Sequence, residues 1–351
     1  MATCKLIEIS QAFHAFDDIL DVRSPAEYAD DHLPGAINVP VLNDEERSRI
    51  GTLFTQVSPF EAKRQGAALI ARNIARHVEE TFGDRQKCWR PLVYCWRGGM
   101  RSGAMAHILA QIGWRAGQLE GGYKTYRCYV IAALETLPLK FDFCVISGAT
   151  GSGKSHLLHA LAEQGGQVLD LEKLAQHRGS LLGDLPGQPQ PTQKTFETRL
   201  WNALRAFTPD RPVYIEAESR KIGVLSVPNV LLDRMRASPC VRIEAPQEAR
   251  VEFLMDDYAH FLGNPTLLAE RLTRLMELHG RVVINRWCEM ARQGEWRPLV
   301  KELLTQHYDP AYRRSSGDSF RQLNNVNMLQ LASLDSDSLR KAAEDLILKE
   351  R

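Results

Sequence analysis

The sequence predicts an α/β protein built from two modules, and three observations support this prediction. Short apolar runs rich in β-branched residues alternate with helical patterns from the N-terminus to about residue 245. A glycine-rich loop at residues 148–155 follows one of these runs and opens a helical pattern. With 351 residues, the chain is long enough for two domains that each bury a hydrophobic core.

The first module is expected at residues 1–136. The apolar runs that predict its strands are Leu6–Ile9, Ile19–Val22, Ala36–Val41 and Leu92–Cys95. The helical patterns lie near Pro25–His32, Glu61–Thr81 and Arg101–Gly113. Strands that alternate with helices pair in parallel, so this module should contain a doubly wound sheet. Residues 137–142 are expected to form a linker.

The second α/β module is expected at residues 143–245. Its predicted strands are Phe143–Ser147, Val168–Leu171, Val213–Glu216 and Val241–Glu244, and its predicted first helix is Lys154–Gln164. A stretch rich in proline and glycine, residues 183–193, predicts a surface loop. From residue 246 to residue 351 the pattern is helical, which predicts a helical C-terminal region.

The composition excludes several classes of protein. A hydrophobic content of 44% and a charged content of 25% are typical of a globular protein, and no apolar run approaches the length that spans a bilayer. The first ten residues lack the apolar core of a secretory leader. We therefore expect a cytoplasmic monomer without membrane contact. Because the formal net charge is only +1, a nucleic-acid partner would need a local basic surface.

The strongest local signal is the unbroken G-A-T-G-S-G-K-S that begins at Gly148, a match to the phosphate-binding P-loop. Gly148, Gly151 and Gly153 let successive backbone N–H groups turn toward an anion, and the helix that follows adds partial positive charge. Lys154 would reach the outer phosphate, and the Ser155 hydroxyl would complete the shell of a Mg²⁺ ion. The pattern predicts a polyphosphate site without showing which polyphosphate binds.

A P-loop usually works with an acidic residue at the end of a neighbouring apolar strand. The run V-Y-I-E-A-E-S (213–219) offers Glu216 or Glu218 in this place, where aspartate is commoner. This departure weakens the case for ordinary nucleotide hydrolysis. The alternative interpretation is that both glutamates form only the solvated end of a strand.

One of the seven cysteines has a distinctive setting. The cysteines form no C-x-x-C pair and have no histidine at zinc-finger spacing, which argues against a disulfide scaffold and a structural zinc site. Cys95, however, ends an apolar strand pattern, and its loop leads into a helical pattern. Such a loop directs N–H groups and a helix dipole at the sulfur, which stabilises the thiolate. The residues predicted to hold a bound oxyanion are Trp96, Arg97, Gly98, Gly99 and Arg101.

The segment D-V-R-S-P-A-E-Y-A-D-D-H-L-P-G-A-I-N-V-P (21–40), together with the Cys95 loop, resembles the rhodanese family. Asp21 and Arg23 match the signature that follows the second strand in that family. The resemblance implies a rhodanese-like fold. It also implies that the loop cysteine carries sulfur or selenium as a persulfide-type adduct.

The order of the modules narrows this resemblance. A rhodanese-like module precedes a P-loop module that also contains D-L-E-K-L-A-Q-H-R-G-S (170–180) and H-Y-D-P-A-Y-R-R-S (307–315). From about residue 6 to residue 316, the chain thereby resembles the tRNA 2-selenouridine synthase family. The resemblance implies a P-loop NTPase-like second module and favours His177 and Arg178 as residues that line its site.

The same resemblance implies a two-step change of the wobble uridine in tRNA that contains 2-thiouridine. The sulfur is first geranylated with geranyl diphosphate, and selenium from selenophosphate then replaces the S-geranyl group. In this interpretation the P-loop stabilises the departing diphosphate, and Cys95 carries the selenium. Geranyl diphosphate and selenophosphate are substrates, no cofactor is tightly bound, and the enzyme that makes selenophosphate is an expected partner.

Two other enzyme classes stay open at the level of sequence. The spacing from Cys95 to Arg101 is also C-x-x-x-x-x-R, the loop of cysteine-dependent phosphatases, whose thiolate attacks phosphorus. A P-loop kinase with a rhodanese-like regulatory module is the other alternative. An assay with a phosphatase substrate would separate the first of these from the synthase.

Basic residues near the C-terminus suggest where tRNA could bind. Nine basic and six acidic residues lie between Glu270 and Arg314, and Trp287, Trp296, Tyr308 and Tyr312 are interspersed as candidates for base stacking. The candidates selected for tRNA contact are Arg271, Arg274, Arg313 and Arg314. In the alternative interpretation, the arginines form a solvated helix face and the aromatic residues belong to the core.

Overall fold

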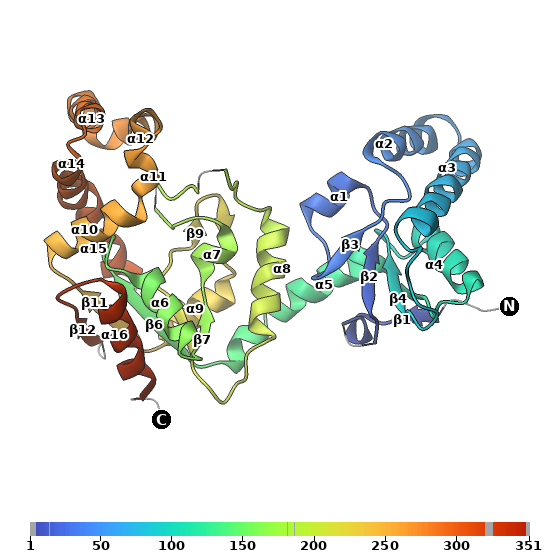
Figure 1. The fold of residues 1–351 in the computed structure, drawn as a ribbon, viewed down its shortest axis with the longest axis horizontal. Coiled ribbons are helices and arrows are strands. Elements are labelled where there is room, and N and C mark those ends of the chain that lie inside the picture. The colour runs from blue at the N-terminus through green and yellow to red at the C-terminus, as the bar shows by residue number, and fades with distance from the viewer. Residues whose placement is uncertain (1–4, 14, 181, 186, 320–325, 349–351) are drawn as a thin grey trace. The chain divides into compact units, whose positions relative to one another are not determined.

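The computed structural model describes residues 5–13, 15–180, 182–185, 187–319 and 326–348. The chain divides into two compact units, which are described separately (Figure 1). The first unit comprises Met1–Glu135 and Pro191–Asn202, and the second comprises Thr136–Gln190 and Ala203–Arg351. Each unit has a parallel sheet flanked by helices, which confirms the predicted α/β class.

A five-stranded sheet forms the centre of the first unit. Its strands are β1 (Lys5–Ile7), β2 (Asp18–Asp21), β3 (Ala36–Asn38), β4 (Pro91–Tyr94) and β5 (Gly117–Leu119). Their spatial order is β1-β5-β4-β2-β3, all neighbours pair in parallel, and β4 is central. The sequence pattern predicted four of these strands and missed β5, a three-residue strand that begins with glycine.

Helices cover this sheet and bury its apolar side chains. They are α1 (Pro25–Asp30), α2 (Asp44–Thr52), α3 (Pro59–Glu80), α4 (Met100–Ile112), α5 (Gly122–Leu134) and α8 (Gln193–Leu204). A 3₁₀ turn, η1 (Ile9–Gln11), and a π-helical turn, η2 (Leu53–Val57), complete the unit. The sequence pattern did not predict α2, because none of its side chains is buried and no apolar period marks it.

Residues Pro191–Asn202, which the sequence pattern assigned to the second module, belong to the first unit. Phe196, Leu200 and Trp201 of α8 are buried, and the Trp201 ring lies 5.8 Å from that of Tyr126. The apolar period of α8 predicts a buried face but not its partner. Local sequence therefore could not reveal that the chain returns to its first unit.

The second unit also has a five-stranded parallel sheet, in the order β12-β11-β6-β8-β7. Its strands are β6 (Phe143–Gly148), β7 (Gln167–Leu169), β8 (Val213–Glu216), β11 (Cys240–Glu244) and β12 (Val326–Gln330), and a small antiparallel pair is formed by β9 (Lys221–Ile222) and β10 (Leu225–Ser226). The four strands predicted for this unit are present, with ends shifted by one or two residues.

The helices nearest the sheet are α6 (Lys154–Glu163), α7 (Leu171–Ala175), α9 (Asn229–Ala237) and α16 (Ser336–Leu348). The further helices are α10 (Gln247–Asp257), α11 (Ala259–Leu262), α12 (Pro265–Leu272), α13 (Met276–Gln293), α14 (Trp296–Leu303) and α15 (Asp309–Ser319), with short turns η3 (Leu137–Lys140), η4 (Thr273–Leu275) and η5 (Leu304–Tyr308). None of the helices in the described residues is both long and apolar enough to cross a bilayer.

One expectation for this unit was wrong. Residues 246–351 are not helical throughout, because β12 joins the sheet beside β11, and α16 then packs on α6. The five-residue run of β12 does not reveal which strand it pairs with, so the sequence pattern did not predict it. The residues expected to form a linker, 137–142, include a 3₁₀ turn at Leu137–Lys140, and Pro138 and Phe141 are buried.

Candidate active site

The Cys95 loop leaves the carboxyl end of β4, the central strand of the first unit, and leads into α4. Gly98 has a φ of +63°, and a Cβ there would lie 2.7 Å from the carbonyl oxygen of Leu119. Gly122 has a φ of +61°, and a Cβ there would collide with the carbonyl oxygen of Cys95. The Tyr123 N–H donates to that same oxygen at 2.9 Å. The turn before α5 therefore supports the loop, a role that the sequence pattern did not reveal.

The thiol of Cys95 is almost completely buried, with 4% of the residue exposed. The Ser102 hydroxyl donates to Cys95 Sγ at 3.1 Å. Gln118 Nε2 in turn donates to Ser102 Oγ at 3.0 Å and to the carbonyl oxygen of Gly98 at 2.6 Å. Ser102 and Gln118 were absent from the sequence prediction. The hydroxyl seven residues after the cysteine was the available signal, whereas the contact of Gln118 depends on the sheet order.

The two arginines predicted to hold an oxyanion have different surroundings. Arg101 Nη1 donates to Glu27 Oε2 at 2.8 Å. Burial raises the pKa of Glu27, whereas the hydrogen bond and the charge of Arg101 lower it. The net result is a pKa below the ordinary value. The side chains of Trp96 and Arg97 are exposed, and the Trp96 ring lies 5.2 Å from that of Tyr123. Arg101 is thus held by a carboxylate, while Arg97 is open to solvent.

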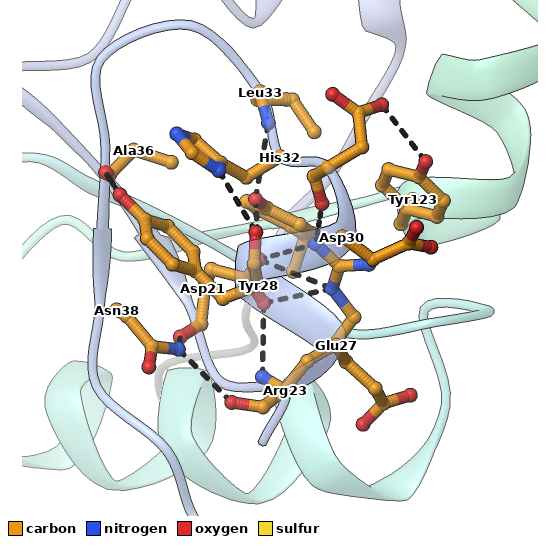
Figure 2. Close-up of polar contacts among 12 residues, drawn as sticks. Asp21, Arg23, Glu27, Tyr28, Asp30, His32, Leu33, Ala36, Asn38 and Tyr123 are labelled. Atoms are coloured by element: carbon orange, nitrogen blue, oxygen red, sulfur yellow. Dashed lines mark hydrogen bonds and ion pairs between the residues drawn. The ribbon is translucent and has the colours of Figure 1, made fainter. Parts of the chain in front are cut away.

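Asp21 and Arg23 form a buried ion pair at the carboxyl end of β2 (Figure 2). Arg23 Nη2 lies 2.6 Å from Asp21 Oδ2, and the same nitrogen donates to the carbonyl oxygen of Asp31 at 2.6 Å. The hydroxyl of Tyr94, the residue before Cys95, donates to Asp21 Oδ2 at 2.7 Å. Figure 2 also shows Arg23 beside Tyr123, whose ring centroid lies 4.0 Å from the guanidinium carbon. These contacts give the two signature residues a structural role in fixing the strand that presents the cysteine.

The P-loop leaves the carboxyl end of β6 in the second unit and leads into α6. Gly151 and Gly153 have φ values of +77° and +80°, so the loop uses the freedom of glycine. Lys154 Nζ donates to the carbonyl oxygen of Gly148 at 3.0 Å, and Ser155 Oγ donates to Glu172 Oε2 at 2.9 Å. The structure therefore brings together all five residues that the sequence predicted to bind phosphate.

Carboxyl groups cluster beside the P-loop. Glu216 is buried, and its Oε1 accepts the Glu172 N–H at 2.7 Å. Burial first, and then the charges of Asp170, Glu172 and Glu218, raise the pKa of Glu216 well above its usual value. Burial and the charge of Glu172 raise the pKa of Glu218 to about 8. The interpretation of these residues as a solvated strand end is therefore wrong for Glu216, whose carboxyl is buried and has a raised pKa.

A cavity of about 580 Å³ opens above the P-loop. The two segments singled out from the sequence, 170–180 and 307–315, both contribute to its wall, among other residues through Glu172, Arg178, Tyr308 and Tyr312. Arg178 donates to the carbonyl oxygen of Asp257 at 2.9 Å and lies over the Tyr258 ring. His177 is buried beside Asp184 and does not line the cavity. Polar, aromatic and phosphate-loop residues thus meet in one place.

Ser155 Oγ and a carboxylate oxygen of Glu172 lie 2.9 Å apart beside the phosphate loop. In the part of the chain that the structure describes, no group of three histidine, cysteine, aspartate or glutamate side chains is arranged to hold a metal ion. A cation here would therefore need oxygen atoms from a bound phosphate as well as from Ser155 and Glu172.

The predicted tRNA contacts fall into two groups. Arg271 and Arg274 both pair with Asp184, Arg274 Nη1 at 3.0 Å. Arg313 and Arg314 are exposed, and Arg313 Nε donates to the carbonyl oxygen of Asp309. Trp287, one of the aromatic candidates for base stacking, is fully buried in the helical core and is not available for that role.

The geometry defines a class of protein: a rhodanese-like unit with a loop cysteine, joined in one chain to a P-loop unit. Comparisons with known proteins match residues 6–127 to the rhodanese-like domain and residues 141–271 to the tRNA 2-selenouridine synthase AAA domain. Proteins named tRNA 2-selenouridine synthase are similar over most of the chain. The one from Nitrosomonas europaea is 33% identical and the match covers 90% of this chain and 81% of that protein. The one from Hydrogenovibrio crunogenus is also 33% identical, and the match covers 84% of this chain and 88% of that protein.

This chain belongs to the tRNA 2-selenouridine synthase family. Of the three classes that the sequence left open, the comparisons match the synthase family.

Proposed function

We propose that this chain converts 2-thiouridine at the wobble position of tRNA into 2-selenouridine in two steps. In the first step the C2 sulfur is alkylated by geranyl diphosphate. In the second step selenium from selenophosphate replaces the S-geranyl group, which leaves as a thiol. The observation that carries the proposal is the cavity above the P-loop, because both segments that resemble the family meet there.

The first step needs a group that stabilises diphosphate as it departs. As sulfur bonds to C1 of the geranyl chain, the bond from C1 to the diphosphate oxygen breaks, and negative charge develops on that oxygen. Lys154 and the N-terminus of α6 would stabilise this charge. Glu218 lines the same cavity, and its ionised form would accept the proton that the uracil ring loses, since a pKa of about 8 makes it a stronger base than an ordinary carboxylate. If Mg²⁺ takes part, Ser155 and Glu172 would hold it and it would neutralise diphosphate charge.

In the second step the P–Se bond of selenophosphate breaks as water attacks phosphorus and phosphate departs. The selenium, which stays at the selenide level, adds to C2, and the C2–S bond breaks as geranyl thiol leaves. This step needs a group that holds the selenium on its way to C2. Cys95 is the candidate, since it lies at the end of a central strand, at the entrance to α4, with a hydroxyl 3.1 Å from its sulfur. Arg97 is exposed and could meet the oxyanion of selenophosphate. Arg101 would first have to leave Glu27. The exposed Arg313 and Arg314 are proposed to contact the phosphate backbone of tRNA. Arg271 and Arg274 are instead paired with Asp184.

Two variants test the assignment of the steps. Lys154→Ala should abolish geranylation, and Cys95→Ser should block selenation while S-geranyl-2-thiouridine accumulates. Purified variants are incubated with RNA that contains 2-thiouridine, geranyl diphosphate and selenophosphate, and the nucleosides are identified by mass spectrometry.

The exposed Cys128 supplies the matched control, because Cys128→Ser also removes one thiol and should leave both products unchanged. Selenouridine made by Cys95→Ser would exclude Cys95 as the carrier. Normal geranylation by Lys154→Ala would exclude the P-loop as the diphosphate site.

A further inference from the structure

An apolar crevice lies among the helices that follow the P-loop sheet. It runs between α10, α11, α12 and α14, and its walls include Leu182, Leu254, Phe261, Leu268, Leu299 and Leu303. Among the residues that the structure describes, none that lines it is charged, and those with a polar group are Thr150, Trp296, Tyr258 and Tyr308. Helices that pack around a shared apolar gap can accept a hydrocarbon ligand without leaving polar groups unpaired.

The crevice is continuous with the cavity above the P-loop. Thr150, Leu254, Tyr258 and Tyr308 line both spaces. Leu254 packs directly against the phosphate loop, since a Cβ at Gly151 would lie 2.7 Å from Leu254 Cγ. The apolar wall therefore begins where the anion-binding backbone ends.

Tyr258 marks the boundary between the charged and the apolar space. The guanidinium carbon of Arg178 lies 4.6 Å from the centroid of its ring, and the ring stacks at 6.0 Å on that of Phe261. Arg178 lines the phosphate cavity, whereas Phe261 lines the crevice. A ligand with an anionic head and a hydrocarbon tail would match this change of surroundings.

We infer that the crevice binds the prenyl chain of an allylic diphosphate whose diphosphate occupies the P-loop. This inference rests on the proposed function and adds the residues that select the length of the chain. The crevice encloses about 60 Å³, roughly the space of two water molecules, so a ten-carbon chain enters by displacing the side chains of α12 and α14. The length of prenyl chain that binds is therefore selected by how far α12 and α14 must move apart to admit it.

Binding measurements test the inference independently of catalysis. Isothermal titration calorimetry of the full chain is performed with inorganic pyrophosphate, dimethylallyl diphosphate, geranyl diphosphate and farnesyl diphosphate. We expect the chain to bind geranyl diphosphate at least about tenfold more tightly than dimethylallyl diphosphate, because each buried methylene adds several-fold to affinity. Leu303→Trp, which fills the crevice, should remove this difference in affinity. Leu268→Ala, which enlarges the crevice, should increase the affinity for farnesyl diphosphate relative to that for geranyl diphosphate.

Inorganic pyrophosphate should bind both variants within about twofold of the unmodified chain, because neither residue lines the P-loop cavity. Leu231→Ala is the matched control, since this buried leucine of α9 lines neither space and should keep the original chain-length preference.

Equal affinity for the dimethylallyl and geranyl compounds in the unmodified chain would overturn the inference, as would an unchanged preference in both crevice variants. Tight, chain-length-dependent binding without any alkylation of RNA would sustain the inference and refute the proposed first step instead.

Discussion

At the scale of single residues, the contact between Glu27 and Arg101 decides whether the Arg101 guanidinium is available to an anion. Glu27 belongs to the capping box of α1, with Ser24, and also holds a guanidinium that the sequence assigned to an oxyanion. The side chains are 22% and 15% exposed, so water screens the pair only partly. One carboxylate thereby joins the start of α1 to the start of α4.

Glu27→Gln is predicted to destabilise the first unit by about 1–2 kcal/mol at pH 7, because Arg101 loses its charged partner. The folded-state pKa of Glu27 lies below its usual 4.5, so its contribution is present above that pH and is lost as the pH falls through the folded pKa. The difference in the free energy of urea unfolding between the two proteins should be full at pH 7 and should shrink as the pH is lowered stepwise from 4.5 through the folded pKa. Glu79→Gln, which neutralises an exposed carboxylate on α3, should have little effect at any of these pH values.

At the scale of elements, both reactive loops follow central strands and open helices, and local patterns were enough to predict them. Gly98 and the residues from Gly148 to Ser155 lie in loops whose conformation their own sequence predicts. The contacts of Gln118, Leu254 and Glu172 could not be predicted, because each depends on which strands and helices become neighbours. The acids beside the P-loop were found as candidates, but their burial became evident only from the fold.

The turn at the start of α5 provides an element-scale prediction. Gly122→Ala should destabilise the first unit by about 2 kcal/mol more than Gly35→Ala, as measured by thermal unfolding. Both glycines have positive φ values, but a Cβ at Gly35 meets nothing within 4 Å, whereas one at Gly122 collides with the backbone of the Cys95 loop. Similar losses in the two variants would show that α5 does not support the loop.

At the scale of the whole molecule, the first unit is assembled from two separated parts of the chain. Asp31 is buried, and its Oδ2 accepts bonds from the Tyr123 hydroxyl at 2.8 Å and the Thr198 hydroxyl at 3.0 Å. Arg127 of α5 pairs with Glu197 of α8. Burial nonetheless raises the pKa of Asp31. Removing α8 would leave this carboxyl with one hydrogen-bond donor fewer and expose apolar side chains around it.

A fragment of residues 1–136 should therefore be less stable than the same fragment mixed with a peptide of residues 191–202. Because the peptide binds only the folded form, the midpoint of thermal unfolding should rise with peptide concentration. A peptide with Phe196→Ala and Leu200→Ala, which removes two buried side chains, should give no such rise. A fragment that is indifferent to both peptides would contradict the two-part assembly.

Translation adds a consequence to this arrangement. The ribosome makes the phosphate loop at residues 148–155 before it makes residues 191–202, which complete the first unit. The first unit, which contains Cys95, can therefore reach its final packing only after the nascent chain has grown past the phosphate loop. Newly made protein would therefore complete the unit that contains Cys95 only after the phosphate loop has been made, and it would complete the second unit, whose sheet includes β12, later still.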